Sequence, residues 1–328
     1  MSFTAVTPLL PSPAMSSALS TPVLIKLENL HPPGSYKLRG MSYKANLAKQ
    51  RGAAHLVAAS GGNAGLAVAY SASLLHLNCS VYVPSSTPPQ TRQLIESYSH
   101  PNSSISCISF GSVYADADKE ARRVAKENPE SEYFSAYDDP ELWTGHSSII
   151  DEIKDQTNGV KPRCIVLSVG GGGLLCGVAE GLAKNSWEDV PIVAMETVGA
   201  NCFALAKKEG KIVEMRPTGV AKSLMASKAA ERMLEWDKKM SITSVEVEER
   251  MAVWGCDMFA NKHRMLVEPA CGVSVACGFD KSILLTAGIQ LDVESESAAA
   301  GPVIIIVCGG AMINVKELTN LKKQTECQ

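Results

Sequence analysis

The sequence predicts an α/β fold with two sheets of parallel strands flanked by helices. Two observations predict it. Short apolar runs recur along the chain, and each has the length of a buried strand. Longer stretches of helical character separate them, and buried strands joined by helical crossovers form parallel sheets that helices cover on both faces. A chain of 328 residues, at roughly 150 per domain, further indicates about two domains.

The candidate elements follow one another in two regions of the chain. In the first region, strands are predicted at His55–Ala59, Cys79–Val83 and Ser104–Phe110, and helices at Ala64–Leu75, Thr87–Glu96 and Asp116–Glu127. In the second region, strands are predicted at Cys164–Val169, Ile192–Met195 and Val303–Val307, with a helix over Leu174–Ala183. Open parallel sheets bind ligands at the carboxyl ends of their strands, so the loops that follow the strands are the first place to look for a site.

The composition excludes several classes of protein. With 31 basic and 34 acidic residues the formal net charge is −3, which gives no electrostatic reason to expect nucleic acid or a membrane as a partner. No apolar run approaches the roughly 20 residues of a membrane span. No basic residue precedes Lys26, as a secretory or mitochondrial signal would require. The ten cysteines form no Cys-x-x-Cys pair and are expected to be reduced, so we expect a cytoplasmic protein.

The strongest local signal is a glycine tetrad, Gly170–Gly173, between a predicted strand and a predicted helix. Without side chains, its backbone N–H groups can close around an oxyanion, and the helix N-terminus behind it adds further donors. The alternative is a tight turn that serves packing alone. A dinucleotide site is a rival because Glu196 lies where a ribose-binding acid would fall, but the G-x-G-x-x-G spacing fails at Leu175 or Cys176. A small phosphorylated cofactor therefore fits better.

Two further segments carry candidate chemistry. Lys37 lies in the turn-rich segment Pro32–Gly40; a lysine that forms an imine must be neutral or already condensed, whereas a solvated surface lysine is the plain alternative. Ser60–Gly65 is a second loop between a strand and a helix. Its amides could bind a carboxylate and Asn63 a phenolic oxygen, or its polar side chains could simply cap the helix.

Several polar residues have structural alternatives. The six histidines have no ligand spacing, so a transition-metal site is not expected. His146 is predicted to cap or pack a helix that follows it, and Glu196 could be a polar strand end. Glu268, before Pro269, is predicted to lie in a loop or at a helix start, and Cys308 could be a core thiol.

Taken together, the motifs resemble a known family. The segments 35–40, 60–65, 168–175 and 307–310 look like those of fold-type-II pyridoxal-phosphate enzymes, whose fold is similar to that of the tryptophan synthase β subunit. The segments 138–146, 194–200 and 266–272 narrow the resemblance to animal-type L-serine/L-threonine dehydratases. The likeness runs from about Thr7 to the C-terminal helix. It implies a small domain, 39–137, inserted in a large domain formed by 1–38 and 138–328.

The resemblance also implies a role for each motif. Lys37 would carry pyridoxal 5'-phosphate covalently and act as the base at the substrate Cα. The residues that would contact the cofactor are Tyr36 and Ser223 on its two faces, Asn63 at the ring hydroxyl, Cys308 at the pyridine nitrogen, and Gly170, Gly171, Gly172, Gly173 and Leu174 at the phosphate. The substrate carboxylate would meet Ser60, Gly61, Asn63 and Ala64. A monovalent cation, usually potassium, would lie near Glu196, Ala200 and Leu224.

The implied reaction is the deamination of L-serine to pyruvate and ammonia, and of L-threonine to 2-oxobutanoate, by elimination of water. A neutral Cys308 at the pyridine nitrogen would give a weaker electron sink than an aspartate and favour prompt loss of the β-hydroxyl. Family relatives are usually homodimers. The alternatives are another fold-type-II reaction, namely β-replacement or serine racemisation, or a weakly active homologue with a regulatory role.

Overall fold

The computed structural model describes residues 4–291 and 301–326, and the chain divides into two compact units. The first unit consists mainly of His31–His146, and the second is built from Val6–Leu30 and Ser147–Gln328. The predicted small domain, 39–137, falls inside the first unit, which extends a few residues beyond it at both ends. Within the described ranges, no helix has both the length and the hydrophobicity that crossing a membrane requires.

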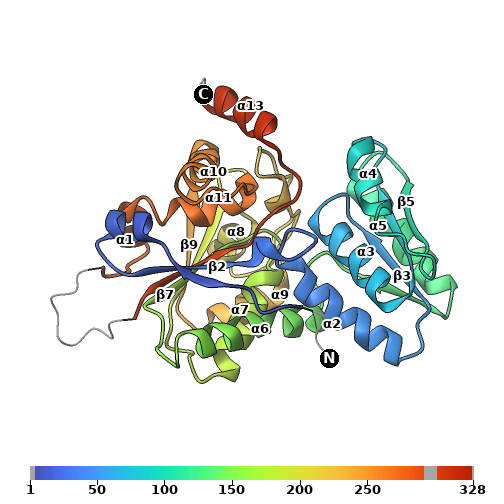
Figure 1. The fold of residues 1–328 in the computed structure, drawn as a ribbon, viewed down its shortest axis with the longest axis horizontal. Coiled ribbons are helices and arrows are strands. Elements are labelled where there is room, and N and C mark those ends of the chain that lie inside the picture. The colour runs from blue at the N-terminus through green and yellow to red at the C-terminus, as the bar shows by residue number, and fades with distance from the viewer. Residues whose placement is uncertain (1–3, 292–300, 327–328) are drawn as a thin grey trace. The chain divides into compact units, whose positions relative to one another are not determined.

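The first unit is a four-stranded parallel sheet in the order β5-β4-β3-β6. Its strands are β3 (His55–Ala59), β4 (Asn78–Val83), β5 (Ile105–Ser109) and β6 (Ser131–Phe134), and its helices are α2 (Lys37–Gln50), α3 (Asn63–Leu75), α4 (Pro89–Glu96) and α5 (Tyr114–Glu127) (Figure 1). The three strands and three helices predicted here are confirmed. The strand β6 was not predicted, because Ser-Glu-Tyr-Phe has only one fully buried residue, Phe134.

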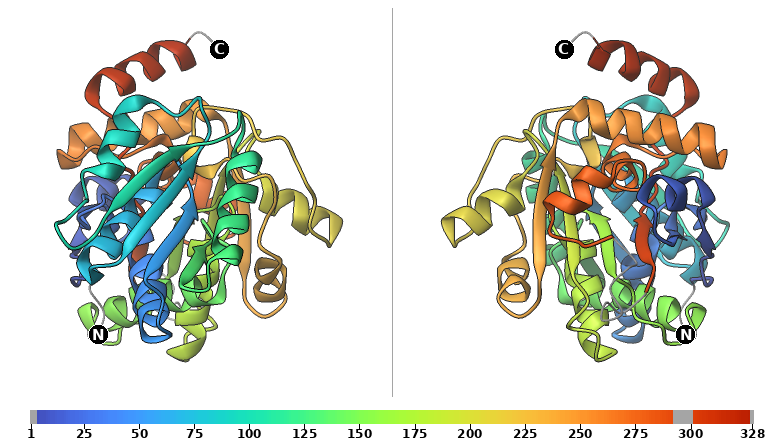
Figure 2. Two further views of the ribbon diagram at one scale, coloured as in Figure 1. Left: turned by 90° about the vertical axis from the view of Figure 1, so that its right-hand side faces the viewer. Right: turned by 90° about the vertical axis from the view of Figure 1, so that its left-hand side faces the viewer.

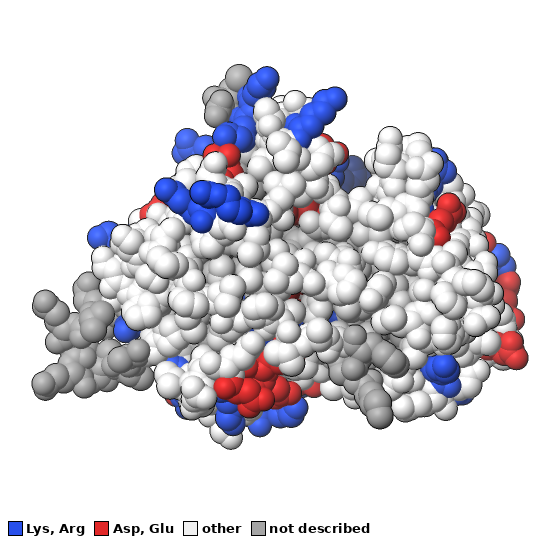
Figure 3. All heavy atoms as spheres, in the orientation of Figure 1, with Lys and Arg blue, Asp and Glu red and all other residues white. Residues whose placement is uncertain are grey.

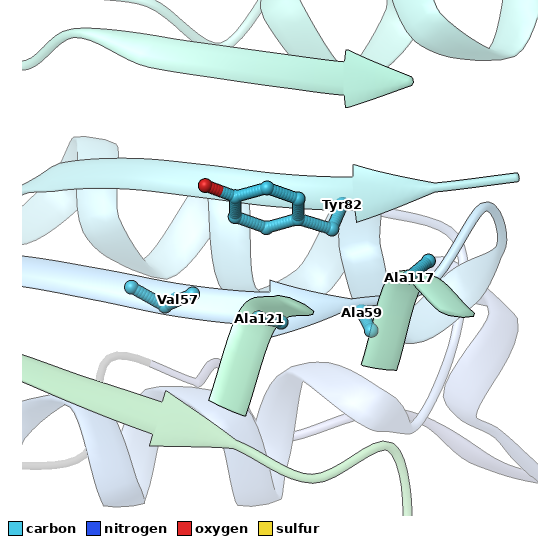
Figure 4. Packing of buried hydrophobic residues seen from close by; sticks show 5 residues of the cluster. All are labelled: Val57, Ala59, Tyr82, Ala117 and Ala121. Carbon is cyan, nitrogen blue, oxygen red and sulfur yellow. The ribbon is translucent and has the colours of Figure 1, made fainter. Parts of the chain in front are cut away.

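Small side chains let α5 lie close to this sheet. Ala117 and Ala121 on α5 pack against Val57 and Ala59 of β3 and against the ring of Tyr82 on β4 (Figure 4). The outward side of α5 is charged, so the helix has the narrow apolar face typical of a helix that covers a sheet. This packing supports the carboxyl end of β3, where the Ser60–Gly65 loop begins.

The second unit is a six-stranded sheet in the order β1-β2-β10-β7-β8-β9, parallel except for β1. Its strands are β1 (Leu9–Pro11), β2 (Val23–Leu27), β7 (Cys164–Ser168), β8 (Ile192–Thr197), β9 (Ile242–Val247) and β10 (Val303–Val307). The α/β class with two parallel-rich sheets is thus confirmed. Figure 1 shows α10 and α11 on one side of this sheet and α7 on the other, and α10 packs along α11 in both views of Figure 2.

The helices of the second unit connect these strands. They are α1 (Pro13–Leu19), α7 (Gly173–Lys184), α8 (Cys202–Glu209), α9 (Glu231–Asp237), α10 (Glu249–His263), α11 (Pro269–Ala276), α12 (Lys281–Thr286) and α13 (Val315–Glu326), with short 3-10 helices η1 (Glu28–Leu30) and η2 (Lys222–Leu224). The boundary between the units falls within α6 (Pro140–Gln156), after His146.

The strand β2 was not predicted because a lysine interrupts its apolar run. Lys26 is completely buried, which is costly unless the charge is paired and its donors are satisfied. Its Nζ atom lies 2.6 Å from Glu152 Oε2 and donates to Gln156 Oε1 and to the carbonyl oxygen of Thr7, both at 2.8 Å. A salt bridge to α6 therefore allows a charged residue in the middle of a buried strand.

Parallel pairing brings the ends of three strands to one edge of the larger sheet. β7 lies between β10 and β8, and all three run in the same direction. The loops that follow them begin at Val169, Val198 and Cys308. In the view of Figure 3 most of the visible side chains are uncharged, and the charged ones form separate small groups.

Candidate functional site

The glycine tetrad lies where the sequence predicted it, between β7 and α7. Gly172 is the N-cap of α7 and has φ +101°, a backbone conformation that favours glycine. The first amides of a helix have no acceptor within the helix, and the helix dipole makes this end favourable for an anion. The tetrad therefore brings N–H donors and a partial positive charge to the edge of the sheet.

Two glycines of the tetrad pack closely on their neighbours, so an added side chain would force the Leu224 backbone or the Met233 side chain to move. A Cβ atom on Gly170 would lie 2.9 Å from Leu224 Cα, and one on Gly172 would lie 2.4 Å from Met233 Sδ. The carbonyl oxygen of Gly171 accepts from the Ala230 amide at 3.0 Å. The segment 224–233 thus supports the tetrad from outside, and the cradle fits a group such as the phosphate of pyridoxal phosphate.

Cys308 follows β10, the neighbour of β7, and is 8% exposed. A hydrogen bond with Cys271 and burial together raise the pKa of its thiol well above the ordinary value, so the thiol is neutral at physiological pH. A neutral thiol is the state that the family resemblance implied for Cys308 at the pyridine nitrogen. The nine cysteines of the described residues are free thiols, as predicted, and Cys327 lies outside those residues.

Ser223 is the middle residue of η2, which lies beside the tetrad through Leu224. Its hydroxyl donates to Glu268 Oε2 at 2.5 Å. Glu268 is the N-cap of α11, so its predicted place at a helix start is confirmed. The interaction between these side chains was not anticipated, because 45 residues separate them in the sequence.

Glu196 lies near the end of β8 and is completely buried. Its carboxylate accepts from the amides of Phe203 at 2.9 Å and Ala204 at 2.8 Å, in the first turn of α8, and from the Ser244 hydroxyl at 2.8 Å. Burial raises the pKa of this carboxyl to about 7, and these hydrogen bonds offset part of the effect. A carboxylate held in this way does not face a ribose, which argues against the dinucleotide site.

Of the three predicted cation ligands, Glu196 and Ala200 lie at the end of β8 and in the turn after it, and Leu224 is the last residue of η2. Leu224 packs against Gly170, whose carbonyl oxygen accepts from Cys202 Sγ at 3.4 Å. Phe203, which follows Cys202, donates its amide to Glu196. Ala200 lies in the turn between β8 and α8, where its amide donates to the Thr197 carbonyl oxygen at 2.9 Å. A carboxylate has about four lone-pair directions, and three hydrogen bonds leave room for one more partner.

In the first unit, Lys37 is the first residue of α2. The segment predicted to be rich in turns is therefore helical from Lys37 onward. The Nζ atom donates to the Ala136 carbonyl oxygen at 2.5 Å and lies 5.2 Å from the ring centroid of Tyr36. The amine is thus half-buried and directed at a carbonyl in the loop after β6, rather than extended into solvent as in the plain alternative.

His146 is placed differently from its prediction. It lies inside α6, which begins at Pro140, and is completely buried, so it packs but does not precede the helix. Its Nδ1 atom accepts from the Gly40 amide at 3.2 Å, and its ring meets that of Tyr36 edge-on at 4.9 Å. A Cβ on Gly40 would lie 2.6 Å from the imidazole, so glycine is needed there for α2 to approach α6. His146 therefore supports Tyr36 and the start of α2.

The Ser60–Gly65 loop joins β3 to α3. Gly62 is the N-cap of α3 without a side-chain cap, so the alternative in which a polar side chain caps this helix is wrong. The Ser60 hydroxyl accepts from the Gly62 amide at 3.2 Å, and a Cβ on Gly65 would lie 2.1 Å from the Ser60 carbonyl oxygen. Asn63 and Ala64 form the first residues of α3. The loop thus presents helix N-terminal amides, which suit a carboxylate.

The structure thus gathers the predicted residues in two sets. The second unit holds the tetrad, Leu174, Ser223, Cys308, Glu196, Ala200 and Leu224, and Leu224 contacts Gly170 directly. The first unit holds Tyr36, Lys37, Ser60, Gly61, Asn63 and Ala64. Sequence reasoning missed Thr87, which lies against Gly61, and the contacts of Glu268. The sequence motif around Glu268 indicated that this residue is important, but it did not show that Ser223 is its hydrogen-bond partner.

Comparisons with known proteins agree with this arrangement. The family model described as pyridoxal-phosphate dependent enzyme matches residues 2–308. The chain is 38% identical over 319 residues to the mouse L-serine dehydratase/L-threonine deaminase, covering 97% of this chain and 94% of that protein. It is 40% identical over 329 residues to the mouse serine dehydratase-like protein, covering 99% and 96%.

A solved structure extends the agreement to the fold. The L-serine ammonia-lyase of the fungus Rhizomucor miehei superposes with a TM-score of 0.88 at 30% identity, covering 99% of each chain. The expected fold-type-II architecture and the resemblance to serine and threonine dehydratases are therefore confirmed. With a family model over almost its entire length and full-length relatives near 40% identity, the chain belongs to the pyridoxal-phosphate dependent enzymes.

Proposed function

We propose that the protein is a pyridoxal-phosphate-dependent ammonia-lyase that converts L-serine to pyruvate and ammonia and L-threonine to 2-oxobutanoate and ammonia. The observation that carries the proposal is full-length similarity to proteins named for these activities, combined with a glycine cradle that fits a phosphate. We further propose that it works in the cytoplasm as a homodimer. Its domains would be those of the sequence prediction, with 39–137 inserted between 1–38 and 138–328.

Each unit contributes residues with defined tasks. The tetrad and the Leu174 amide would bind the cofactor phosphate, and Cys308 would offer the pyridine nitrogen a neutral thiol. Tyr36 and Ser223 would contact the ring, and Asn63 would bind the ring hydroxyl. Pyridoxal phosphate, when bound, supplies an electron sink for the charge that develops at the substrate Cα. Ser60, Gly61, Asn63 and Ala64 would hold the substrate carboxylate.

Lys37 is the residue proposed to move the proton. Its amine would hold the cofactor and, with substrate bound, would take the proton from Cα. A proton donor near the phosphate cradle would protonate the departing β-hydroxyl, so that it leaves Cβ as water. The enamine released by this elimination hydrolyses to the keto acid and ammonia. A potassium ion bound by Glu196, Ala200 and Leu224 would brace the Ser223 segment without taking part in the chemistry.

The experiment is borohydride reduction of the purified protein followed by peptide mapping, together with an assay of pyruvate from L-serine without any added nucleophile. We expect the label on Lys37, and a Lys37→Ala variant that loses the label and about 10³-fold or more in kcat. Lys49→Ala is a matched control, since Lys49 lies on the same helix and also donates to a backbone carbonyl, that of Leu75 at 2.8 Å.

Other outcomes would separate the alternatives. A label on another lysine, or none with cofactor present, contradicts the assignment of Lys37. Formation of D-serine without pyruvate would indicate racemisation, and activity only with an added thiol would indicate β-replacement. A labelled protein that releases no keto acid would indicate a regulatory homologue.

A further inference from the structure

We propose that Glu268 is a positioning residue that ties the Ser223 segment to the segment after β10 and so shapes the wall against which the cofactor ring lies. The place of the ring rests on the proposed function. The tether itself is a feature of the second unit alone. Glu268 is 5% exposed and starts α11, where its own carbonyl oxygen accepts from the amides of Cys271 and Gly272, both at 2.8 Å.

The Glu268 carboxylate divides its two oxygens between two segments that are distant in the sequence. Oε2 accepts from the Ser223 hydroxyl at 2.5 Å, and Oε1 accepts from the Met312 amide at 2.9 Å. Ser223 belongs to η2, whereas Met312 lies four residues after Cys308 in the loop that leads to α13. One side chain thus joins the two segments predicted to contact the ring face and the pyridine nitrogen.

Gly310 shows how closely the second segment approaches this carboxylate. It has φ +129°, and a Cβ there would lie 2.3 Å from Glu268 Cδ. Any other residue would push the loop away from Glu268 and strain its backbone. The loop after Cys308 is therefore shaped to lie directly on the carboxylate.

The first segment extends the tether to the phosphate cradle. Leu224, the neighbour of Ser223, packs against the backbone of Gly170. Glu268 thus contacts two of the segments with predicted cofactor contacts directly, namely η2 and the loop at Cys308, and is linked to the tetrad through Leu224. The loop after Cys308 has no regular helix or strand, and η2 is a 3-10 turn of only three residues.

A carboxylate suits this position because both of its partners are donors. A hydroxyl and a backbone N–H can each bind one oxygen of the same group, and hydrogen bonds to a charged acceptor are stronger than those to a neutral one. Glutamine could still accept from one donor and receive a bond at the serine oxygen, but with weaker contacts. Alanine would leave both donors without this acceptor in a buried place.

The experiment combines amide hydrogen exchange with cofactor titration on the full-length protein. Glu268→Ala, Glu268→Gln and Ser223→Ala are compared with wild type for exchange in peptides covering 219–226 and 308–314, without cofactor. Binding of pyridoxal 5'-phosphate is then followed by its absorbance. Ser282→Ala is the matched control, because Ser282 also donates to a carboxylate at a helix start, Asp280 at 2.7 Å, outside the proposed site.

We expect Glu268→Ala to speed exchange in both peptides at least tenfold and to weaken cofactor binding at least tenfold. Ser223→Ala should speed exchange in 219–226 only, with a few-fold loss of affinity, and Glu268→Gln should lie between wild type and Glu268→Ala. Ser282→Ala should match wild type in both measurements. Because Ser223→Ala and Glu268→Gln are mild changes, they test the tether even if Glu268→Ala does not fold.

Unchanged exchange in both peptides in Glu268→Gln and Ser223→Ala, with unchanged affinity, would overturn the proposal. Faster exchange spread over the whole second unit would do so as well, since it would show a general structural role. Failure of the wild-type protein to bind pyridoxal phosphate would contradict the proposed function instead, and the exchange data would still decide whether the tether exists.

Discussion

Two neighbouring turns of the larger sheet have the same topology and opposite chemistry. After β7 the chain enters α7 through the glycine tetrad, and after β8 it enters α8 through the turn at Val198–Asn201. Both helices present N-terminal amides at the same sheet edge. At α8 those amides bind the protein's own carboxylate, Glu196. At α7 the turn that leads into the helix consists of glycines, so it offers only backbone groups.

The difference teaches which helix end is available to a ligand. A helix N-terminus attracts an anion whether the anion belongs to the chain or to a bound molecule. Because Glu196 satisfies α8 internally, that end serves to support the fold. The N-terminus of α7 begins with glycines that pack against Leu224 and Met233. We expect this helix end to bind the anionic group of a ligand.

The largest expected effect comes from adding a side chain to the α7 turn. Gly172→Ala places a methyl group 2.4 Å from Met233 Sδ at a residue with φ +101°. We expect the turn to shift and the affinity for pyridoxal 5'-phosphate to fall roughly 10- to 100-fold, measured by absorbance titration.

Gly210→Ala provides the control for backbone strain alone. Gly210 also has positive φ, +65°, but nothing lies within 4 Å of its Cβ position. It should lower stability by about 1 kcal/mol and leave cofactor affinity as in wild type. Equal affinity in the two variants would mean that the α7 turn does not bind the phosphate.

A second effect, on stability rather than on cofactor affinity, is expected from the titration of the carboxylate at α8. The pKa of Glu196 rises from 4.5 to about 7 because the group is buried. The folded protein therefore binds this proton more tightly than the unfolded chain does. The stabilising contribution is fully present below about pH 4.5 and is lost as the pH rises through 7. We expect the loss to be on the order of 3 kcal/mol.

Urea unfolding at several pH values between 4.5 and 8 measures this effect. Glu196→Gln should remove the pH-dependent difference, whereas Glu209→Gln, at the exposed end of the same helix, should keep it. Potassium chloride at pH 8 should restore part of the stability if the cation binds the charged carboxylate as proposed. The same pH slope in wild type and Glu196→Gln would contradict the assignment.

The smallest effect concerns the turn after β3 in the first unit, which has more space than the tetrad. Nothing lies within 4 Å of a Cβ on Gly62, and one on Gly61 would lie 3.0 Å from Thr87 Oγ1. Thr87 is on a partly exposed loop and can move slightly. We expect Gly61→Ala to restrict the loop and raise kcat/KM for L-serine about two- to fivefold.

Gly62→Ala is the comparison within the same loop and should stay within about twofold of wild type. Thr87→Ser in the Gly61→Ala background removes the methyl group at 3.1 Å from the new side chain, so it should keep the gain. A fall in kcat/KM in Gly61→Ala that Thr87→Ser does not reverse would show that the loop requires glycine at this position.

The local sequence pattern was sufficient to predict a feature wherever that feature depends on one continuous segment of the chain. Apolar runs such as Val303–Val307 predict strands because every residue in them is buried. The tetrad predicts an anion site because four consecutive residues without side chains leave only backbone donors. The α/β class, the order of the elements and the family resemblance all followed from such segments.

Tertiary structure decided what depends on partners far along the chain. Lys26 can occupy a buried strand only because α6 brings Glu152 to it, and Glu196 does not face a ribose because α8 and Ser244 already bind its carboxylate. Glu268 gained its partners from residues more than 40 positions away on either side. Sequence alone thus determined which groups can do chemistry, whereas folding determined which of them are already bound to one another, because hydrogen bonds and burial depend on distance in space.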